Sequence, residues 1–270
     1  AGFAGRLTIN LPDPAMAWRM QGTMNLAGSG AIPVTRVAGS KVFVTGELNV
    51  SSGIAQITAD TAFSTQQVAA NVSIQGGSTL RMRGVTSVGT NTNFAGTGTL
   101  QNGVNGVMEL LPGVSLGQVG LTNNSVLHIG AGTAGIASVD RFTSTADALW
   151  NVDIGGPIAG TQHDLVLVGS GATVLGGTLD VSLIGLGGGA IFAPSVGDQF
   201  TILLSLSGVS GTFTNDPVTQ INGLTYDWTV LYNSHSVVLR LDSVVPAPGT
   251  AALLGAALLL AGRRQRSALS

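Results

Sequence analysis

The segment Val44-Thr45-Gly46-Glu47-Leu48-Asn49-Val50 alternates apolar and polar residues, and Ser78-Thr79-Leu80-Arg81-Met82 shows the same alternation further along the chain. Successive side chains of a β-strand point to opposite faces, so this pattern predicts strands with one buried face and one solvated face. Each segment has too few apolar residues to bury a core alone. The pattern therefore favours many short strands that are stacked on one another.

Short segments of this kind recur between residues 1 and 160, separated by Gly, Asn, Ser and Thr, whereas helix signals do not recur. The expected strands are Arg6 to Leu11, Gly22 to Leu26, Lys41 to Val50, Asn71 to Ile74, Thr79 to Met82, Gly98 to Leu100, Val107 to Leu110, Ser125 to Ile129 and Leu149 to Ile154. The sequence therefore predicts an all-β fold.

The apolar centres of these segments recur at a loose period of roughly 24 to 27 residues, which is the size of one turn of a solenoid. These centres are Val50, Ile74, Leu100, Leu127 and Val152. We interpret residues 1–160 as the turns of a right-handed parallel β-helix. An antiparallel β-sandwich remains the alternative, because the number of short strands does not separate the two folds.

From residue 161 the expected strands become longer. They are Asp164 to Val168, Gly177 to Leu183, Gln199 to Leu204, Gly208 to Phe213, Thr225 to Tyr232 and Ser236 to Leu241. The last two should form a hairpin that turns at Asn233 and Ser234, with one apolar row on each strand. Those rows are Trp228, Val230, Tyr232 and Val237, Leu239, Leu241. We predict that residues 161–242 form an antiparallel cap over the last turn, where open strand edges would otherwise be exposed.

The composition agrees with a long, turn-rich β structure. Among 270 residues there are 40 Gly, no Cys and only 9% charged residues, whereas about 25% charged residues is typical of soluble domains. No disulfide can stabilise the chain, so stability must come from stacked strands. With a formal net charge of −2 and a single lysine, Lys41, the chain is not expected to bind nucleic acid.

The C-terminal segment 243–270 has a different character. The short motif Val245-Pro246-Ala247-Pro248-Gly249 precedes an apolar stretch over about 249–262, and the basic end 263–266 contains Arg263, Arg264 and Arg266. As a helix, the apolar stretch would almost cross a hydrocarbon core of about 30 Å, with the arginines reaching the interface. Arginines at this end should stay in the cytoplasm, which places the rest of the chain across the inner membrane.

This order of short Pro motif, apolar helix and basic end resembles the PEP-CTERM sorting signal, which exosortase enzymes of Gram-negative bacteria recognise and process. The family's usual Glu between the two prolines is Ala247 here. The resemblance implies an exported protein that is processed at Val245, Pro246, Ala247 and Pro248. The alternative is an ordinary C-terminal membrane anchor.

A second, looser resemblance covers about a third of the chain. The C-terminal part is similar to that of autotransporter-like β-helix repeat proteins that carry the same sorting tag. The resemblance lies in His163 to Val168, Gly176 to Val181, Gly197 to Leu203 and Gly208 to Phe213. It implies an exported solenoid, and it brings no known catalytic residues.

Candidate catalytic residues are sparse. The chain has two Glu, Glu47 and Glu109, and its most closely spaced Asp residues are Asp140, Asp147 and Asp153. Single Asp residues in Gly-rich loops usually cap turns. His163 and Asp164 are adjacent, so on a strand they point to opposite faces and cannot act as a base and its orienting acid.

We therefore expect an exported, non-enzymatic structural or adhesive protein of the cell surface or extracellular matrix. Its expected partners are exosortase and an exopolysaccharide, and we expect no cofactor and no metal. The alternatives are a polysaccharide-active enzyme or a carbohydrate-binding protein on the same fold. Convergence of Asp140, Asp147 and Asp153 within about 5 to 10 Å would favour the enzyme.

Overall fold

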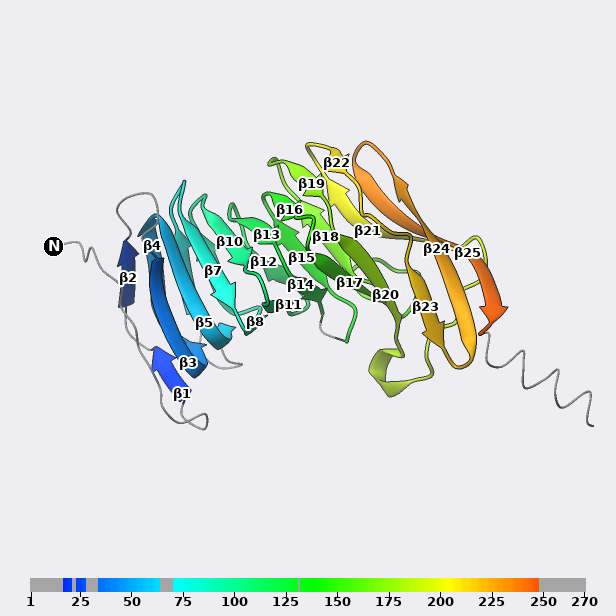
Figure 1. The fold of residues 1–270 in the computed structure, drawn as a ribbon, viewed down its shortest axis with the longest axis horizontal. Coiled ribbons are helices and arrows are strands. Elements are labelled where there is room, and N and C mark those ends of the chain that lie inside the picture. Colours follow the sequence, from blue (N-terminus) through cyan, green and yellow to red (C-terminus); the bar gives the residue numbers. More distant parts are fainter. Residues whose placement is uncertain (1–16, 21–22, 28–33, 64–69, 131, 248–270) are drawn as a thin grey trace, which may run out of the picture.

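The computed structural model describes residues 17–20, 23–27, 34–63, 70–130 and 132–247, and over these residues the fold is all-β. The described part contains 25 strands, and its one helical element is the 3₁₀ turn Leu186–Gly188. The strands follow one another in sequence order along the long axis of the molecule (Figure 1). The all-β prediction is confirmed.

Most strands belong to four parallel stacks, named A to D here. Stack A contains β7 (Thr79–Arg83), β10 (Thr99–Asn102), β13 (Gly120–Asn123), β16 (Phe142–Ser144), β19 (Thr173–Leu175) and β22 (Val209–Gly211). Stack B contains β8 (Val85–Val88), β11 (Val107–Leu110), β14 (Val126–Ile129), β17 (Leu149–Ile154) and β20 (Thr178–Leu183). Stack C contains β2 (Thr23–Ala27), β4 (Glu47–Ser52), β6 (Ala70–Ile74) and β9 (Thr92–Ala95), and stack D contains β12 (Val114–Ser115), β15 (Ile136–Val139), β18 (Leu165–Val168) and β21 (Gln199–Ser205).

In stacks A, B and D every strand pairs with the strand three positions further along the chain, as β7 does with β10 and β8 with β11. Three consecutive strands therefore return the chain to the same stack, one position along. This parallel order is compatible with a β-helix. The antiparallel sandwich does not fit it, because stacks A, B and C are parallel throughout their described strands.

Stacks A and B are joined at the N-terminal side by long strands. β1 (Ala17–Met20), β3 (Val34–Val44) and β5 (Ile54–Phe63) complete one 14-stranded sheet with them, and β5 pairs with both β7 and β8. β7 and β8 are separated by Gly84, whose φ of 111° lies in a region that only glycine adopts readily. At this glycine the long strand of one turn becomes two strands in the next.

The core consists of inward side chains that lie opposite one another in successive turns. In stack A, Leu80, Leu100, Leu121 and Phe142 are in register and fully buried. The inward row of stack B is Met108, Leu127 and Trp150. Each side chain thus packs on its counterpart above and below, and this contact removes apolar surface from water at about 25 cal/mol per Å².

Polar groups interrupt the apolar column at the corner between stacks A and B. Asn102 and Asn123 are 1% and 0% exposed, and they lie opposite each other in register. Asn102 Nδ2 donates to Asn123 Oδ1 at 2.8 Å and to the carbonyl of Val126 at 2.7 Å. Asn123 Nδ2 donates to the carbonyl of Leu149 at 3.2 Å, and its Oδ1 accepts the N–H of Ser125. The two amides therefore hydrogen bond to backbone groups at the corner that have no partner in the strand pairing.

The length of the repeat differs from the prediction. Val50 and Ile74 lie opposite each other in stack C as expected, but Leu100 belongs to stack A and Leu127 to stack B. Side chains that hydrogen bond between neighbouring turns are 20 to 24 residues apart in this part of the chain. Later turns are longer because loops such as 155–164 interrupt them. The predicted period was inaccurate because the apolar centres used for it belong to different stacks.

Antiparallel pairing occurs at the C-terminal end. β23 (Val218–Ile221), β24 (Leu224–Tyr232) and β25 (Ser236–Pro246) pair antiparallel, and β25 also pairs antiparallel with β21. The hairpin predicted from Trp228 to Leu241 is confirmed, with its turn closed by Asn233 N donating to Ser236 O. However, β18, β19, β20 and β22 still pair in parallel. The segment 161–242 therefore contains both kinds of pairing.

The last turn is closed by side chains as well as by strands. Asn215 accepts the N–H of Leu179 through Oδ1 and donates to its carbonyl through Nδ2, both at 2.9 Å. Thr219 Oγ1 donates to the carbonyl of Val181 at 2.6 Å. The edge of β20 is thus occupied by polar side chains of this chain, which is one way in which proteins protect edge strands.

Replacement of the buried asparagine, Asn123→Ala, should lower the free energy of unfolding by about 2–4 kcal/mol, because it leaves several buried partners without a hydrogen bond. The matched control is Asn49→Ala, which removes an exposed amide that donates to Asn25 at 2.9 Å, and it should cost less than about 1 kcal/mol. Urea unfolding followed by circular dichroism measures both. Equal losses in the two variants would contradict the structural role of the corner amides.

Removal of the edge-covering amide, Asn215→Ala, should lower stability by about 1–2 kcal/mol and promote self-association, because the backbone groups of Leu179 lose their partners. Asn233→Ala, which removes only an exposed bond to Ser236 in the hairpin turn, is the control. Urea unfolding and analytical ultracentrifugation distinguish the two variants. A fully monomeric Asn215→Ala protein of unchanged stability would refute the capping role.

Candidate functional site

The expected sorting motif begins at the end of the last strand. Val245 and Pro246 close β25 and pair with Thr225 and Leu224 of β24, and Val245 is 44% exposed. Ala247 N donates to the carbonyl of Gly223 at 2.8 Å. The start of the motif is therefore an exposed strand end.

The rest of the expected signal lies outside the described residues. This part comprises Pro248, the apolar stretch 249–262 and the basic residues Arg263, Arg264 and Arg266. Within the described residues, no helix has the length and apolar character needed to span a membrane.

The outer face of stack C has two rows of polar side chains, which we call the stack C polar face. One row consists of Thr23, Glu47, Asn71 and Asn93, which lie opposite one another in register and are exposed. Thr23 Oγ1 donates to Glu47 Oε2 at 2.9 Å, and Asn93 Nδ2 donates to Asn71 Oδ1 at 3.0 Å. Because neighbouring strands are about 4.8 Å apart, the row presents hydrogen-bonding groups at regular intervals.

The second row of the stack C polar face is two residues further along each strand. Asn25, Asn49 and Ser73 are in register, and Asn49 donates to Asn25 at 2.9 Å. An amide that uses one donor within the row retains another donor and acceptor lone pairs for a ligand. Together the two rows form a polar surface that is suited to hydroxyl-rich molecules.

Stack B presents an apolar row beside a polar row. The polar row is Ser87, Glu109, His128, Asn151 and Asp180 in register. Ser87 Oγ donates to Glu109 Oε2 at 2.9 Å, and Asn151 Nδ2 lies 3.3 Å from His128 Nε2. The apolar row consists of Val85, Val107, Val126 and Leu149, each of which lies two residues before a member of the polar row on the same strand. Sequence reasoning did not find these rows, because their members are about 20 residues apart and only the register brings them together.

The three aspartates proposed as a possible catalytic group are separate. Asp140 forms an ion pair with Arg141 at 3.1 Å, whereas the buried Asp153 accepts the N–H of Gly132 at 2.9 Å. Asp147 lies on the exposed turn before β17, whereas Asp153 lies four residues into that strand, so about 13 Å of β17 lies between them. No group of three metal-ligating side chains occurs among the described residues.

His163 and Asp164 are both buried, and their side chains bind different backbone groups. The ring nitrogens of His163 face the carbonyls of Gly156 at 3.0 Å and Thr201 at 3.1 Å. The two carboxyl oxygens of Asp164 accept the N–H groups of Gly135 and Asp153, each at 2.8 Å. Both residues therefore fix loop backbone to neighbouring turns and have no catalytic partner in each other.

Burial dominates the ionisation of this cluster. Removal from water raises the pKa of Asp164 to about 8, an effect that its two backbone donors oppose. Burial also raises the pKa of Asp153 and lowers the pKa of His163. At neutral pH the folded protein therefore favours the uncharged forms of Asp164 and His163.

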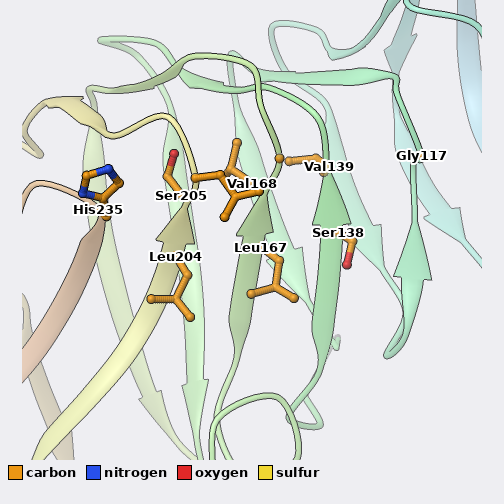
Figure 2. A pocket seen from close by; sticks show the side chains of 10 residues that line it. Gly117, Ser138, Val139, Leu167, Val168, Leu204, Ser205 and His235 are labelled. Atoms are coloured by element: carbon orange, nitrogen blue, oxygen red, sulfur yellow. The ribbon is translucent and has the colours of Figure 1, made fainter.

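An apolar groove of about 630 Å³ lies on the outer face of stack D. Figure 2 shows Ser138, Leu167 and Leu204 in one line on neighbouring strands, with His235 at one end. The exposed Leu206 also lines the groove. His235 is the one titratable side chain of this lining, so the groove offers little acid or base chemistry.

Comparison with known proteins gives no family. No protein-family model matches the chain, and no curated protein matches it significantly.

Asp164 should make stability depend on pH. Its pKa is about 8 in the folded protein and lower in the unfolded chain. Its contribution to the free energy of unfolding is therefore fully present below about pH 4 and is lost as the pH rises to about 8. Between pH 6.5 and 8 His163 contributes little to this pH dependence, because its lowered pKa reduces stability only at a pH below its ordinary pKa of 6.5. The melting temperature should therefore fall over this interval.

Asp164→Asn should flatten this fall, because the amide does not ionise, although it accepts only one of the two backbone N–H groups and so lowers stability at every pH. Asp147→Asn, on its exposed turn, is the control and should keep the wild-type profile. Thermal unfolding at several pH values tests both variants. An unchanged slope in Asp164→Asn would contradict the assignment.

Proposed function

We propose that this chain is an exported structural and adhesive protein of the cell surface or extracellular matrix of a Gram-negative bacterium. The observation that carries the proposal is the stack C polar face, where exposed Thr, Asn and Glu side chains repeat from strand to strand. Polar rows of this kind suit a long hydroxyl-rich polymer, which they would bind through many weak contacts. The proposed ligand is an exopolysaccharide.

The proposed architecture is a right-handed parallel β-helix with an antiparallel cap. Its support is the pairing of every third strand in stacks A, B and D and the antiparallel hairpin of β24 and β25. In such a scaffold each turn contacts its neighbours alone, so a long outer surface forms without a large globular core. This shape suits a matrix component.

Enzymatic action on polysaccharide has less support. Glu109 and Asp180 lie on the same outer row of stack B, but three strand spacings, or about 14 Å, separate them, which is more than a carboxylate pair allows. Platforms for sugar stacking are also missing among the described tryptophan side chains, because Trp150 and Trp228 are buried. A structural role remains the better proposal.

The proposed route to the surface is exosortase processing at Val245, Pro246, Ala247 and Pro248, with the following apolar segment in the inner membrane until cleavage. The exposed end of β25 supports this route, because a processing enzyme can approach Val245 and Pro246 without unfolding the core. Arg263, Arg264 and Arg266 would hold the end of the chain on the cytoplasmic side.

Intact-mass spectrometry of the protein from cells and medium, in strains with and without exosortase, tests the proposal. Loss of the segment after about Pro248 is expected only where exosortase is present. A Pro246→Ala, Pro248→Ala double variant should retain its tail in both strains, with Pro157→Ala, on an exposed loop, as the control. A C-terminus at Ser270 in both strains would reduce the tail to a membrane anchor and refute sorting.

A further inference from the structure

Two arginines project from the outer face of one strand in stack A. In β7 the inward residues Leu80 and Met82 are fully buried, so Arg81 and Arg83 share the opposite face, two residues apart. Each has a partly exposed side chain. Two like charges are thereby placed close together on a chain whose net charge is negative.

Neither arginine has a carboxylate partner. The ion pairs within the described part of the chain are Arg141 with Asp140 and Arg240 with Asp242. Asp60, at the same end of the adjacent strand β5, accepts the N–H of Val85 instead. Partial burial, and to a smaller extent the positive charge of Arg83, lowers the pKa of Arg81.

The two guanidinium groups are also incompletely hydrogen bonded. Arg81 Nε donates to Gln101 Oε1 at 2.5 Å, and Arg83 Nε is buried without a partner. Arg141 is different, because its Nη atoms donate to the carbonyls of Thr97 and Gly98 and to Asp140. Arg141 therefore has a structural role, whereas Arg81 and Arg83 retain free donors.

The strands that follow β7 in stack A offer the pair no negative charge. β7, β10 and β13 contain no acidic residue, and Gln101 and Thr122 continue the outer row beyond Arg81. On the other side Gln56 lies opposite Arg81, and Arg36 of β3 occupies the next position in register. A Cβ on Gly103 would lie 3.0 Å from Arg83 Cγ and 3.2 Å from Arg81 Cγ, so both arginine stems pack against this glycine.

We propose that Arg81 and Arg83 form a binding site for the anionic groups, carboxylate or sulfate, of an acidic polysaccharide. Guanidinium groups bind such oxyanions through paired hydrogen bonds, and a bound anion removes the repulsion between the two arginines. The neighbouring Gln101 and Thr122 can bind hydroxyl groups of the same polymer. This inference rests on the proposed function and specifies its ligand as acidic.

Nucleic acid is the less favoured polyanion. Binding to a phosphate backbone needs many clustered basic residues. Beyond Arg81 the outer row of stack A continues with the uncharged Gln101 and Thr122, and the polar row of the neighbouring stack B contains Glu109 on β11. Because no further Arg or Lys follows in these rows and Glu109 would repel phosphate, a polysaccharide with spaced charges fits better.

The test measures binding of the full chain, in a mild nonionic detergent, to polygalacturonate, dextran sulfate, neutral dextran and duplex DNA by affinity electrophoresis. The wild type should bind at least one acidic polysaccharide, and its affinity should fall several-fold between about 50 and 300 mM salt. R81Q/R83Q should weaken this binding about tenfold or more, because each lost bidentate contact is charge-assisted. R81K/R83K, which keeps charge but not the paired geometry, should recover only part of it.

The control variant is R240Q, which removes one positive charge at the exposed Arg240–Asp242 pair and should change the affinity less than twofold. Urea unfolding verifies that all variants are folded. Wild-type affinity in R81Q/R83Q, an equal loss in R240Q, or tighter binding of DNA than of either acidic polysaccharide would overturn the proposal. The preferred acidic polymer distinguishes carboxylate from sulfate.

Binding of dextran identifies which inference has failed. If dextran and the acidic polymers bind equally well to wild type and R81Q/R83Q, the acidic site is wrong while a polysaccharide-binding role survives. If no polysaccharide binds, both fail. Exosortase processing is measured independently of either result.

Discussion

The structure depends on in-register pairing between parallel strands of successive turns. A strand inside a parallel stack has its backbone partners in the turn before and the turn after, so the same register that aligns hydrogen bonds also aligns Leu80, Leu100 and Leu121 in the interior. A slip of one residue would move every buried side chain of a strand to the outside. Core packing and strand pairing therefore enforce each other, which explains how a chain without disulfides and with few charged residues holds an extended shape.

The need to pair every buried backbone group is also visible where polar side chains interrupt the apolar column. At the corner, Asn102 and Asn123 replace apolar residues and bind backbone groups that would otherwise be buried without partners. His163 and Asp164 do the same for the loop after β17, and Asn215 does so at the edge of β20. These polar side chains thus bind backbone groups where the regular ladder stops, since an unpaired backbone group in the interior is costly.

Strands with strongly apolar inward residues could be predicted from the local alternation of apolar and polar residues, whereas short polar strands could not. The strands around Leu80, Leu127 and Trp228 were predictable because their inward residues are strongly apolar. Thr92–Ala95 and Val114–Ser115 were not, because a short polar strand is held by its neighbours in register and carries little signal of its own. The repeat length was misjudged for a related reason, since each turn contains three strands and the apolar centres of different stacks look alike in sequence.

The candidate sites also differ in whether the sequence alone could predict them. A contiguous motif such as Val245 to Pro248 is visible in sequence, whereas the rows on the outer faces are made of residues from different turns. Because the core fixes the inward residues, the outward ones are free to differ from face to face: amides on stack C, carboxylates on stack B and unpaired arginines on stack A. A single scaffold therefore presents chemically distinct surfaces around one axis, and a polymer bound along one face leaves the others open. This geometry follows from stacking alone, and it supports the proposed matrix role because several faces can act at the same time.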